Sequence, residues 1–245
     1  MTIAAVDGGR WAVMDGPAAV GSARLWCVTA REYRIEIVVD AAYRGHGHGA
    51  RLFDHVFAVA RRDGARSVEL RPSADDEHSI AFASRRGFVE TMRIHHVELA
   101  LADARHDAQL EVMDRLAREA VAIVTFGDFA ARTKDAHAAY LDVVDAARDG
   151  MLDAPPTVVD GSTIVAEQRG RLVGFTSTRG TGVRPELRGR GIATALNVAA
   201  IDAAISRGET TIRTTCSHPA MRHITEKLGF RETACELRMV RLLES

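Results

Sequence analysis

The chain has 245 residues and an almost balanced charge, with 32 Lys and Arg against 33 Asp and Glu. This balance gives no electrostatic case for binding nucleic acid, and no apolar run is long enough to cross a bilayer. The spacing of Cys27, Cys216 and Cys235 fits neither a disulfide framework nor a zinc site. Without a signal peptide at its start, the sequence predicts a cytoplasmic protein.

The N-terminal part of the chain is predicted to begin directly with strands. The expected strands are, in order, residues 11–14, 18–29, 34–39 and 67–71. A helix with an apolar stripe from Leu52 to Ala60 separates the last two strands and ends at Gly64. A second helix then leads to Gly87 and Phe88. This part has no room for a strand and helices ahead of its hairpin.

The C-terminal part is predicted to have those leading elements. A connecting helix is expected near 106–119, and a strand at 121–126 follows it. Asp128 is expected to cap a helix that runs to about Arg148. The later elements are a loop at 153–156, a hairpin of 163–167 with 172–178, a helix ending at Gly208, a strand at 210–214, and a helix that leads to Gly229 and Phe230.

A glycine-rich loop occurs twice in this pattern. Residues 39–52 and 183–196 align without a gap at an offset of 144 positions, from 39 to 183, with Val, Arg, two Gly, a tiny residue and Leu in register. The helix-ending glycines, Gly64 and Gly208, keep this offset, and the closing Gly-Phe pairs match at 142, from 87 to 229. A period this long indicates a duplicated domain, whereas a chance likeness of glycine turns would not extend to the helix ends.

Each loop follows a strand-rich run and opens a helix, which is how a backbone cradles phosphate. Neither copy has the Gly-Lys-Ser/Thr ending of a Walker A loop. A dinucleotide-binding loop would follow a strand of a βαβ unit directly, whereas here an Arg precedes the glycines and hairpin strands precede the loop. Arg44 and Arg188 open the two loops, where each could pair with phosphate or brace the turn.

The pattern Val-x4-Arg-Gly-x-Gly-x-Gly/Ala-x2-Leu resembles the acyl-CoA-binding motif of the GNAT superfamily of N-acetyltransferases. Residues 181–193 are close to this pattern, and the run from Met221 to Phe230 resembles the last helix and closing strand of the superfamily. The whole chain resembles a tandem-GNAT protein. The resemblance implies an α/β (α+β) fold of two GNAT-like domains, each a mixed, centrally splayed β-sheet flanked by helices, with the N-terminal copy lacking the leading strand and helices. The expected domains are 1–103, a linker helix at 104–119, and 120–245.

The resemblance implies acetyl-CoA, or another acyl-CoA, as co-substrate. The expected binding residues lie on the strand, loop and helix start of each copy. In the second copy, our first choice, they are Thr181, Gly182, Val183, Arg188, Gly189, Arg190, Gly191, Ile192, Ala193 and Thr194; in the first copy they are Val38, Val39, Arg44, Gly45, His46, Gly47, His48, Gly49 and Ala50. We expect no metal, because His46 and His48 have no further ligands in a visible cluster.

Two residues are candidates for catalysis. Glu36 precedes the first loop on a strand where many GNAT enzymes place a base, and the alternative is a solvated Glu on the polar face of the strand. The equivalent position of the second copy is Gly180. His218 could act as a base or contact CoA, or it could be a surface histidine beside a capping Ser217.

Both copies depart from the family's pattern. The family often has a Tyr as general acid four residues before the closing Gly, where this chain has Ala83 and Thr225. The second copy also has a short hairpin, with only Arg179 and Gly180 separating its strands. We therefore expect an N-acetyltransferase acting on a primary amine of a small molecule, as a monomer or homodimer. The alternative is a non-catalytic acyl-CoA-binding or dimerising protein.

Overall fold

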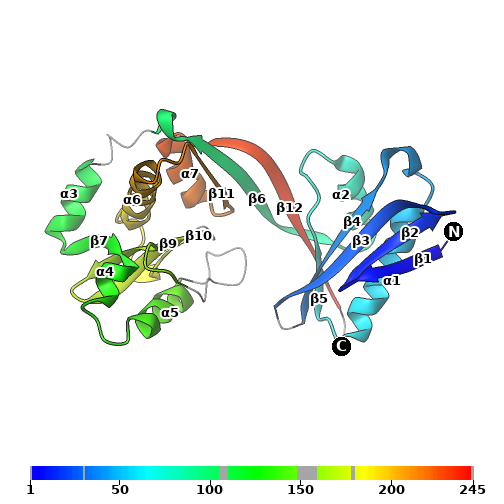
Figure 1. Cartoon of the computed structure of the whole chain (residues 1–245), viewed down its shortest axis with the longest axis horizontal. Helices are drawn as coiled ribbons and strands as arrows, with labels where there is room; N and C mark the ends of the chain where they lie inside the picture. Colours follow the sequence, from blue (N-terminus) through cyan, green and yellow to red (C-terminus); the bar gives the residue numbers. More distant parts are fainter. Residues whose placement is uncertain (1, 30, 105–109, 148–158, 178–179, 244–245) are drawn as a thin grey trace. The chain divides into compact units, whose positions relative to one another are not determined.

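The computed structural model describes residues 2–29, 31–104, 110–147, 159–177 and 180–243 (Figure 1). The chain divides into two compact units, residues 1–93 with 235–245, and residues 94–234. Each unit contains one copy of the glycine loop. The division into two related units agrees with the repeat, and the fold is the mixed α/β one that was expected.

The first unit is a sheet with one long helix packed against it. Its elements are β1 (Thr2–Asp7), β2 (Arg10–Asp15), β3 (Ala18–Thr29), β4 (Glu32–Val39), α1 (His48–Arg62), β5 (Ser67–Leu70), α2 (Glu77–Ser84) and the first part of β6 (Val89–Ala100). Strands β1 to β4 are antiparallel neighbours, β4 pairs with β5 in parallel, and β5 pairs with the end of β12 (Arg231–Leu242). Helix α1 buries Leu52, Phe53, Val56 and Ala60, the stripe that the sequence predicts.

One expectation for this unit was wrong. The first unit does have a leading strand, because β1 pairs with β2 from Thr2 opposite Met14 to Asp7 opposite Arg10. The apolar and polar residues of β1 do not alternate, and only Ile3 of the strand is partly buried. The period-two signal is therefore missing, and only the leading helices are absent from the described part of this unit.

The second unit has the leading helices. Its elements are the end of β6, α3 (Leu110–Arg118), β7 (Val121–Thr125), α4 (Phe126–Ala130), α5 (Ala136–Ala146), β8 (Ile164–Gln168), β9 (Arg171–Ser177), β10 (Gly180–Val183), α6 (Ile192–Ser206), β11 (Thr211–Cys216), α7 (Pro219–Leu228) and the start of β12. Strands β7 to β10 form one antiparallel sheet, whereas β11 pairs with β6. No helix in the described residues has the length and apolar character needed to span a membrane.

The single helix expected from Asp128 to Arg148 is instead two helices. Thr125, not Asp128, caps α4, because its Oγ1 accepts a hydrogen bond from the Asp128 N–H at 3.0 Å. Asp135 then takes a left-handed conformation with φ of 62°, which separates α4 from α5. Residues 148–158, which include the loop expected at 153–156, lie outside the described residues.

Helix α6 bridges the split sheet of the second unit. Its residues Ile192, Ala195 and Leu196 pack with the core of the β7–β10 sheet, while Val198 and Ile201 pack with the strands β6 and β11. The other face of the β7–β10 sheet packs against α5 through Tyr140 and Phe175. The central splay that the family resemblance implies is therefore present here, between β10 and β11.

The two repeats exchange their last strands, β6 and β12, which we call the crossed closing strands. Residues 239–242 of β12, at the end of the second repeat, pair with β5 of the first unit. Residues 95–100 of β6, at the end of the first repeat, pair with β11 of the second unit. Each compact unit is therefore completed by a strand from the other repeat. The domain boundaries expected from the sequence remain a prediction. The division into compact units is based on contacts between residues, and it does not define which segments of the chain fold alone.

Candidate functional site

The two glycine loops have the same backbone geometry. Each strand leads to a 3-10 turn, Ala41–Tyr43 or Pro185–Leu187, and then to a glycine that caps a 15-residue helix. The capping residues, Gly47 and Gly191, have φ of 82° and 87°, a region that favours glycine. The N–H groups of the first helical turn therefore point into the loop, as an anion site requires.

The arginine of each loop braces the turn. Arg44 donates from Nε to the carbonyl of Val39 at 3.0 Å, and Arg188 donates in the same way to the carbonyl of Val183 at 3.1 Å. Of the two roles left open by the sequence, the structure provides the bracing contact. A guanidinium has further N–H donors, so either arginine can still donate a hydrogen bond to a phosphate.

The loops differ in what surrounds them. A Cβ built on Gly45, Gly47 or Gly189 would meet no atom within 4 Å, whereas one on Gly191 would lie 2.7 Å from Cγ1 of Val112 and 2.9 Å from Nη2 of Arg115. Helix α3 therefore lies against the second loop. Arg115 donates from Nη2 to the Arg190 carbonyl at 2.9 Å, and Arg190 lies 3.6 Å from Glu119.

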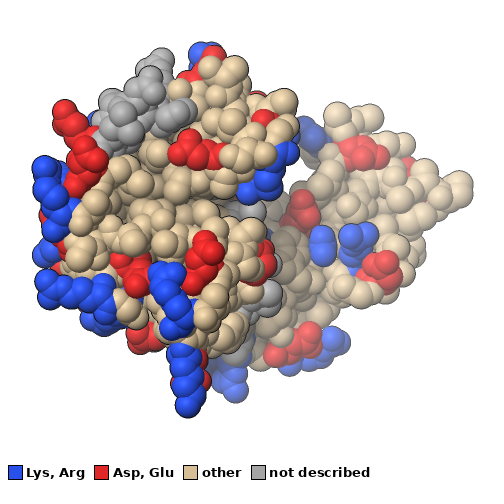
Figure 2. All heavy atoms as spheres, turned by 60° about the vertical axis from the view of Figure 1, so that its left-hand side comes forward, with Lys and Arg blue, Asp and Glu red and all other residues tan. Residues whose placement is uncertain are grey.

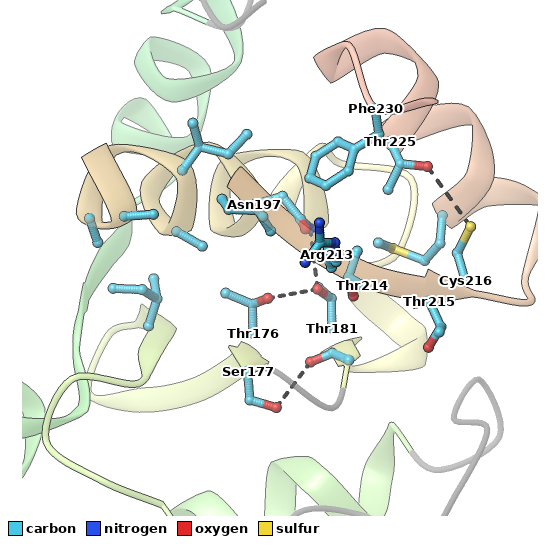
Figure 3. A pocket seen from close by; sticks show the side chains of 18 of the residues that line it. Thr176, Ser177, Thr181, Asn197, Arg213, Thr214, Thr215, Cys216, Thr225 and Phe230 are labelled. Carbon is cyan, nitrogen blue, oxygen red and sulfur yellow. Dashed lines mark hydrogen bonds between the residues drawn. The ribbon is translucent and has the colours of Figure 1, made fainter. Parts of the chain in front are cut away.

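A groove of about 400 Å³ lies in the second unit, between β10 and β11 (Figure 3). Its lining includes Thr181 of β10, Asn197 and Ala200 of α6, and residues 211–216 of β11. The groove lies beside α6, where the helix stops packing on the β7–β10 sheet and begins to pack on β6 and β11. It lies beside β10, the strand that leads to the second loop and that contains the expected CoA contacts Thr181, Gly182 and Val183.

A chain of polar side chains crosses the groove. The hydroxyls of Thr176 and Thr181 are 2.8 Å apart, and Asn197 donates from Nδ2 to Thr181 Oγ1 at 3.2 Å (Figure 3). The same Nδ2 atom donates to the Ala193 carbonyl at 2.7 Å, one turn earlier in α6. This network fixes the orientation of Thr181 at the start of β10.

The equivalent place in the first unit holds a charge cluster. Glu69 is 4 % exposed, and its carboxylate pairs with Arg34, with Arg71 at 3.1 Å and with Arg238 at 2.6 Å. Burial alone would raise the pKa of Glu69, but the three guanidinium groups outweigh it and hold the pKa below its ordinary value. The first unit therefore has a buried ion-pair network beside β4, with β4 and β5 still paired at residues 32–34.

The two candidate catalytic residues belong to different units. Glu36 is exposed on β4 of the first unit, opposite Arg24 of β3. His218 lines the groove of the second unit, and its Nδ1 accepts a hydrogen bond from the Ala220 N–H at 3.2 Å. His218, and not Ser217, is therefore the N-cap of α7. The expected CoA contacts divide in the same way, with residues 38–50 in the first unit and 181–194 in the second.

Other polar side chains of the second unit already have partners. The Thr225 hydroxyl, at the position where the family often has Tyr, donates to the Arg222 carbonyl at 2.9 Å. Glu167 of β8, the strand next to β9, pairs with Arg132. Burial raises the pKa of the Cys216 thiol, which disfavours the thiolate that a nucleophile needs.

Sequence reasoning missed Asn197, Thr176 and Arg115. Asn197 is a polar residue in a helix that is otherwise mostly apolar on its buried side, and this was the signal that could have identified it. Thr176 and Arg115 carry no such signal, because their proximity to Thr181 and to the second loop arises only from tertiary packing.

These features define a class of protein. A sheet that is split between two strands, with a glycine loop and a helix following one of them, is the architecture of acyl-CoA-dependent acyltransferases. The model of the acetyltransferase (GNAT) family matches residues 3–88 and 133–230, and the chain belongs to this family. No curated protein matches the chain significantly.

Solved structures share the fold at low sequence identity. A GCN5-related N-acetyltransferase from Sphaerobacter thermophilus is 16 % identical with a TM-score of 0.64, over 97 % of this chain and 81 % of that one. A tandem GNAT protein of the clavulanic acid biosynthesis pathway is 18 % identical with a TM-score of 0.62, over 96 % and 83 %. A glucosamine N-acetyltransferase region of a fungal multi-domain GH3 β-N-acetylglucosaminidase is 18 % identical with a TM-score of 0.66, over 94 % of this chain and 32 % of that one.

Proposed function

We propose that the second unit transfers an acyl group, most simply acetyl from acetyl-CoA, to a primary amine of a small molecule. The observation that carries this proposal is the groove between β10 and β11, because the second glycine loop begins where β10 ends. Backbone N–H groups from Gly189 to Ile192 and the positive end of α6 would hold the pyrophosphate. The space over Gly189 fits this role, since no atom lies within 4 Å of a Cβ built there.

The chemistry needs few groups from the protein. The amine nitrogen attacks the thioester carbonyl, the C–N bond forms, the C–S bond breaks and CoA leaves as a thiolate. A backbone N–H at the start of the split would stabilise the oxyanion. A base must first remove one proton from the ammonium to give the neutral amine that attacks, and the second proton that the nitrogen loses as the amide forms finally reaches the thiolate. His218 is our candidate base because it lines the groove, and Glu36 would serve only a site in the first unit.

A second function, a non-catalytic acyl-CoA-binding or dimerising protein, is favoured by specific contacts. The cap bond occupies the Nδ1 lone pair of His218, and Thr225 and Glu167 are both engaged elsewhere. Release of free thiol from acetyl-CoA on addition of a panel of primary amines separates the two functions. Thiol release with an N-acetylated product supports the enzyme, whereas CoA binding without thiol release supports the binder.

The choice of the second loop has a matched test. Gly45 and Gly189 have φ of 81° and 79°, and both have open space where a Cβ would be. Gly189→Asp and Gly45→Asp therefore add the same strain and the same negative charge to the two loops. Calorimetric titration with CoA should show at least tenfold weaker binding for Gly189→Asp and unchanged binding for Gly45→Asp. The reverse result would move the site to the first unit, and a wild-type protein that does not bind CoA would remove the proposal.

A further inference from the structure

One edge of β7 is open in the second unit. Strand β8 pairs with one side of β7, and among the described strands none pairs with the other side (Figure 1). The Phe126 N–H donates to the Thr163 carbonyl at 2.7 Å, in the same register as the β7–β8 pair. The direction of these bonds alternates along an antiparallel strand, so Ala122 and Val124 also bond to β8. The backbone groups that point to the open edge are those of Val121, Ile123 and Thr125.

Strand β7 has none of the features that usually protect a sheet edge. Its five residues, Val121–Thr125, contain no charged residue and no proline, and they pair with β8 without a bulge. Natural edge strands usually have one of these features, because an open apolar edge readily accepts another strand. The edge strand β1 of the first unit has one, since its register with β2 shifts between Ala5 and Asp7. The regular, uncharged edge of β7 is therefore suited to a partner strand.

An apolar groove of about 460 Å³ lies along β7, beside α3. All the residues that line it are apolar, and they include Met113 and Ala117 of α3 and Ile123 of β7. Ala117 is exposed, and Met113 and Ile123 are partly exposed. A charged partner would lose its hydration here without gaining a counter-charge. The groove therefore favours an apolar strand at this edge.

A second copy of β7 meets these requirements, because the strand is complementary to itself. In an antiparallel pair about a two-fold axis through Ile123, outward N–H groups of each copy meet outward C=O groups of the other, and the two Ile123 side chains become cross-strand neighbours. The charges that flank the strand also match. The exposed Arg118 precedes β7 and the exposed Asp128 follows it, and antiparallel pairing brings the start of one strand to the end of the other.

We propose that two copies of this chain form a two-fold dimer through β7, so that their β7–β10 sheets join into one continuous sheet. The pair involves only five residues of each strand and the adjacent groove, so the interface is small and the dimer dissociates on dilution. This inference is independent of the proposed function, because the groove assigned to acyl-CoA lies beside β10, at the opposite edge of the sheet.

Hydrogen exchange at single amides tests the strand pairing. When the protein concentration is raised a hundredfold across the dissociation range, exchange of the Val121, Ile123 and Thr125 amides should slow at least threefold. The amides of Ala122 and Val124 are the control within the same strand, because they bond to β8 in the monomer and in the dimer. Outward amides whose exchange does not depend on concentration would overturn the proposal.

Sedimentation velocity tests the surface. The wild type should change from monomer to dimer over the same hundredfold range. Ala117→Lys places an ammonium group in the groove of each copy and should weaken the dimer at least tenfold, while lysine, a good helix former, keeps α3 intact. Ala138→Lys, the same change at an exposed position of α5 outside the groove, should sediment as the wild type does. A wild type that stays monomeric throughout, or a dimer that Ala117→Lys leaves intact, would refute the inference.

Discussion

At the scale of single residues, His218 has two roles that a pair of variants can separate. Its Nδ1 caps α7, and its ring lines the groove. His218→Ala should lose both roles, whereas His218→Asn should keep the cap but provide no base. If His218 is the base, both variants lose at least tenfold in kcat/KM, and only His218→Ala loses about 1 kcal/mol of stability. Activity of His218→Asn at the wild-type level across pH 6 to 9 (about the range of a tuned base) would show that His218 acts only as a cap.

Tyr140 contains a buried polar group without a hydrogen bond. Its ring packs between Phe126 and Phe175, with ring centroids 5.7 and 5.6 Å away, and its hydroxyl has no partner among the described residues. Burial, with the negative charge of Asp160, raises the pKa of Tyr140 to about 12, so the hydroxyl stays protonated. Tyr140→Phe should therefore be neutral or stabilising by up to about 1 kcal/mol in urea unfolding. Tyr140→Ala, the control for packing, should cost about 3–5 kcal/mol. A loss above about 1 kcal/mol for Tyr140→Phe would mean that the hydroxyl is bonded in solution.

Glu69 should make the first unit sensitive to acid. Its pKa lies below the ordinary value of 4.5, so the ionised form is favoured by folding. The stability it contributes is present above the unfolded-state pKa, and it is lost as pH falls below about 4.5 through the lowered folded-state value. Glu69→Gln should cost about 3 kcal/mol at neutral pH, since three guanidinium groups lose their counter-charge.

The pH dependence of stability distinguishes the ion-pair role of Glu69 from a role in packing alone. Stability of the first unit, followed by hydrogen exchange of residues 52–60, should fall less steeply between pH 5 and 3 (about the range in which carboxylates titrate) in Glu69→Gln than in the wild type. Parallel acid curves for the two proteins would contradict the assignment.

At the scale of elements, α3 contributes to the second loop although the sequence marks it only as a connection. Arg115 lies at the loop through its bond to the Arg190 carbonyl and is otherwise exposed. If the loop holds the phosphates of CoA, Arg115→Ala should weaken CoA binding about tenfold by removing a nearby cation. Arg118→Ala, an exposed arginine on the same helix, is the matched control.

The phosphate-free fragment pantetheine separates charge from shape in this experiment. Calorimetry should show that Arg115→Ala leaves pantetheine binding unchanged, and that added salt reduces its effect on CoA binding. Equal losses of CoA and pantetheine affinity would mean that Arg115 supports the loop mechanically and does not pair with phosphate.

The sequence predicts elements well where the signal is local. The glycine loops, α1 and the strand β3 follow from spacing and periodicity within a few residues. The break between α4 and α5 depends on the left-handed Asp135, which no periodicity reveals. The groove depends on the short hairpin and on the position of β11. The sequence shows the short hairpin, but it does not show that β11 pairs with β6.

At the scale of the whole molecule, the sheets are completed by crossed strands. The two closing strands follow similar Gly-Phe pairs and have similar patterns, so the sequence cannot indicate which unit each strand joins. A core substitution should therefore destabilise the compact unit in which the side chain is buried, and not the sequence repeat to which the residue belongs. Leu99 is in the first repeat but is buried in the core of the second unit, whereas Leu237 is in the second repeat but is buried in the core of the first.

This crossing makes opposite predictions for two matched variants. Leu99→Ala and Leu237→Ala remove the same side-chain atoms from sites that are 0 % and 3 % exposed, at a cost of about 2–5 kcal/mol each. Hydrogen exchange should accelerate for Leu99→Ala in residues 192–228, and for Leu237→Ala in residues 20–70, because local opening is governed by the core that loses the contact. If each variant instead opened its own repeat, the strands would not be crossed in solution, and each domain could then fold from a continuous segment of chain.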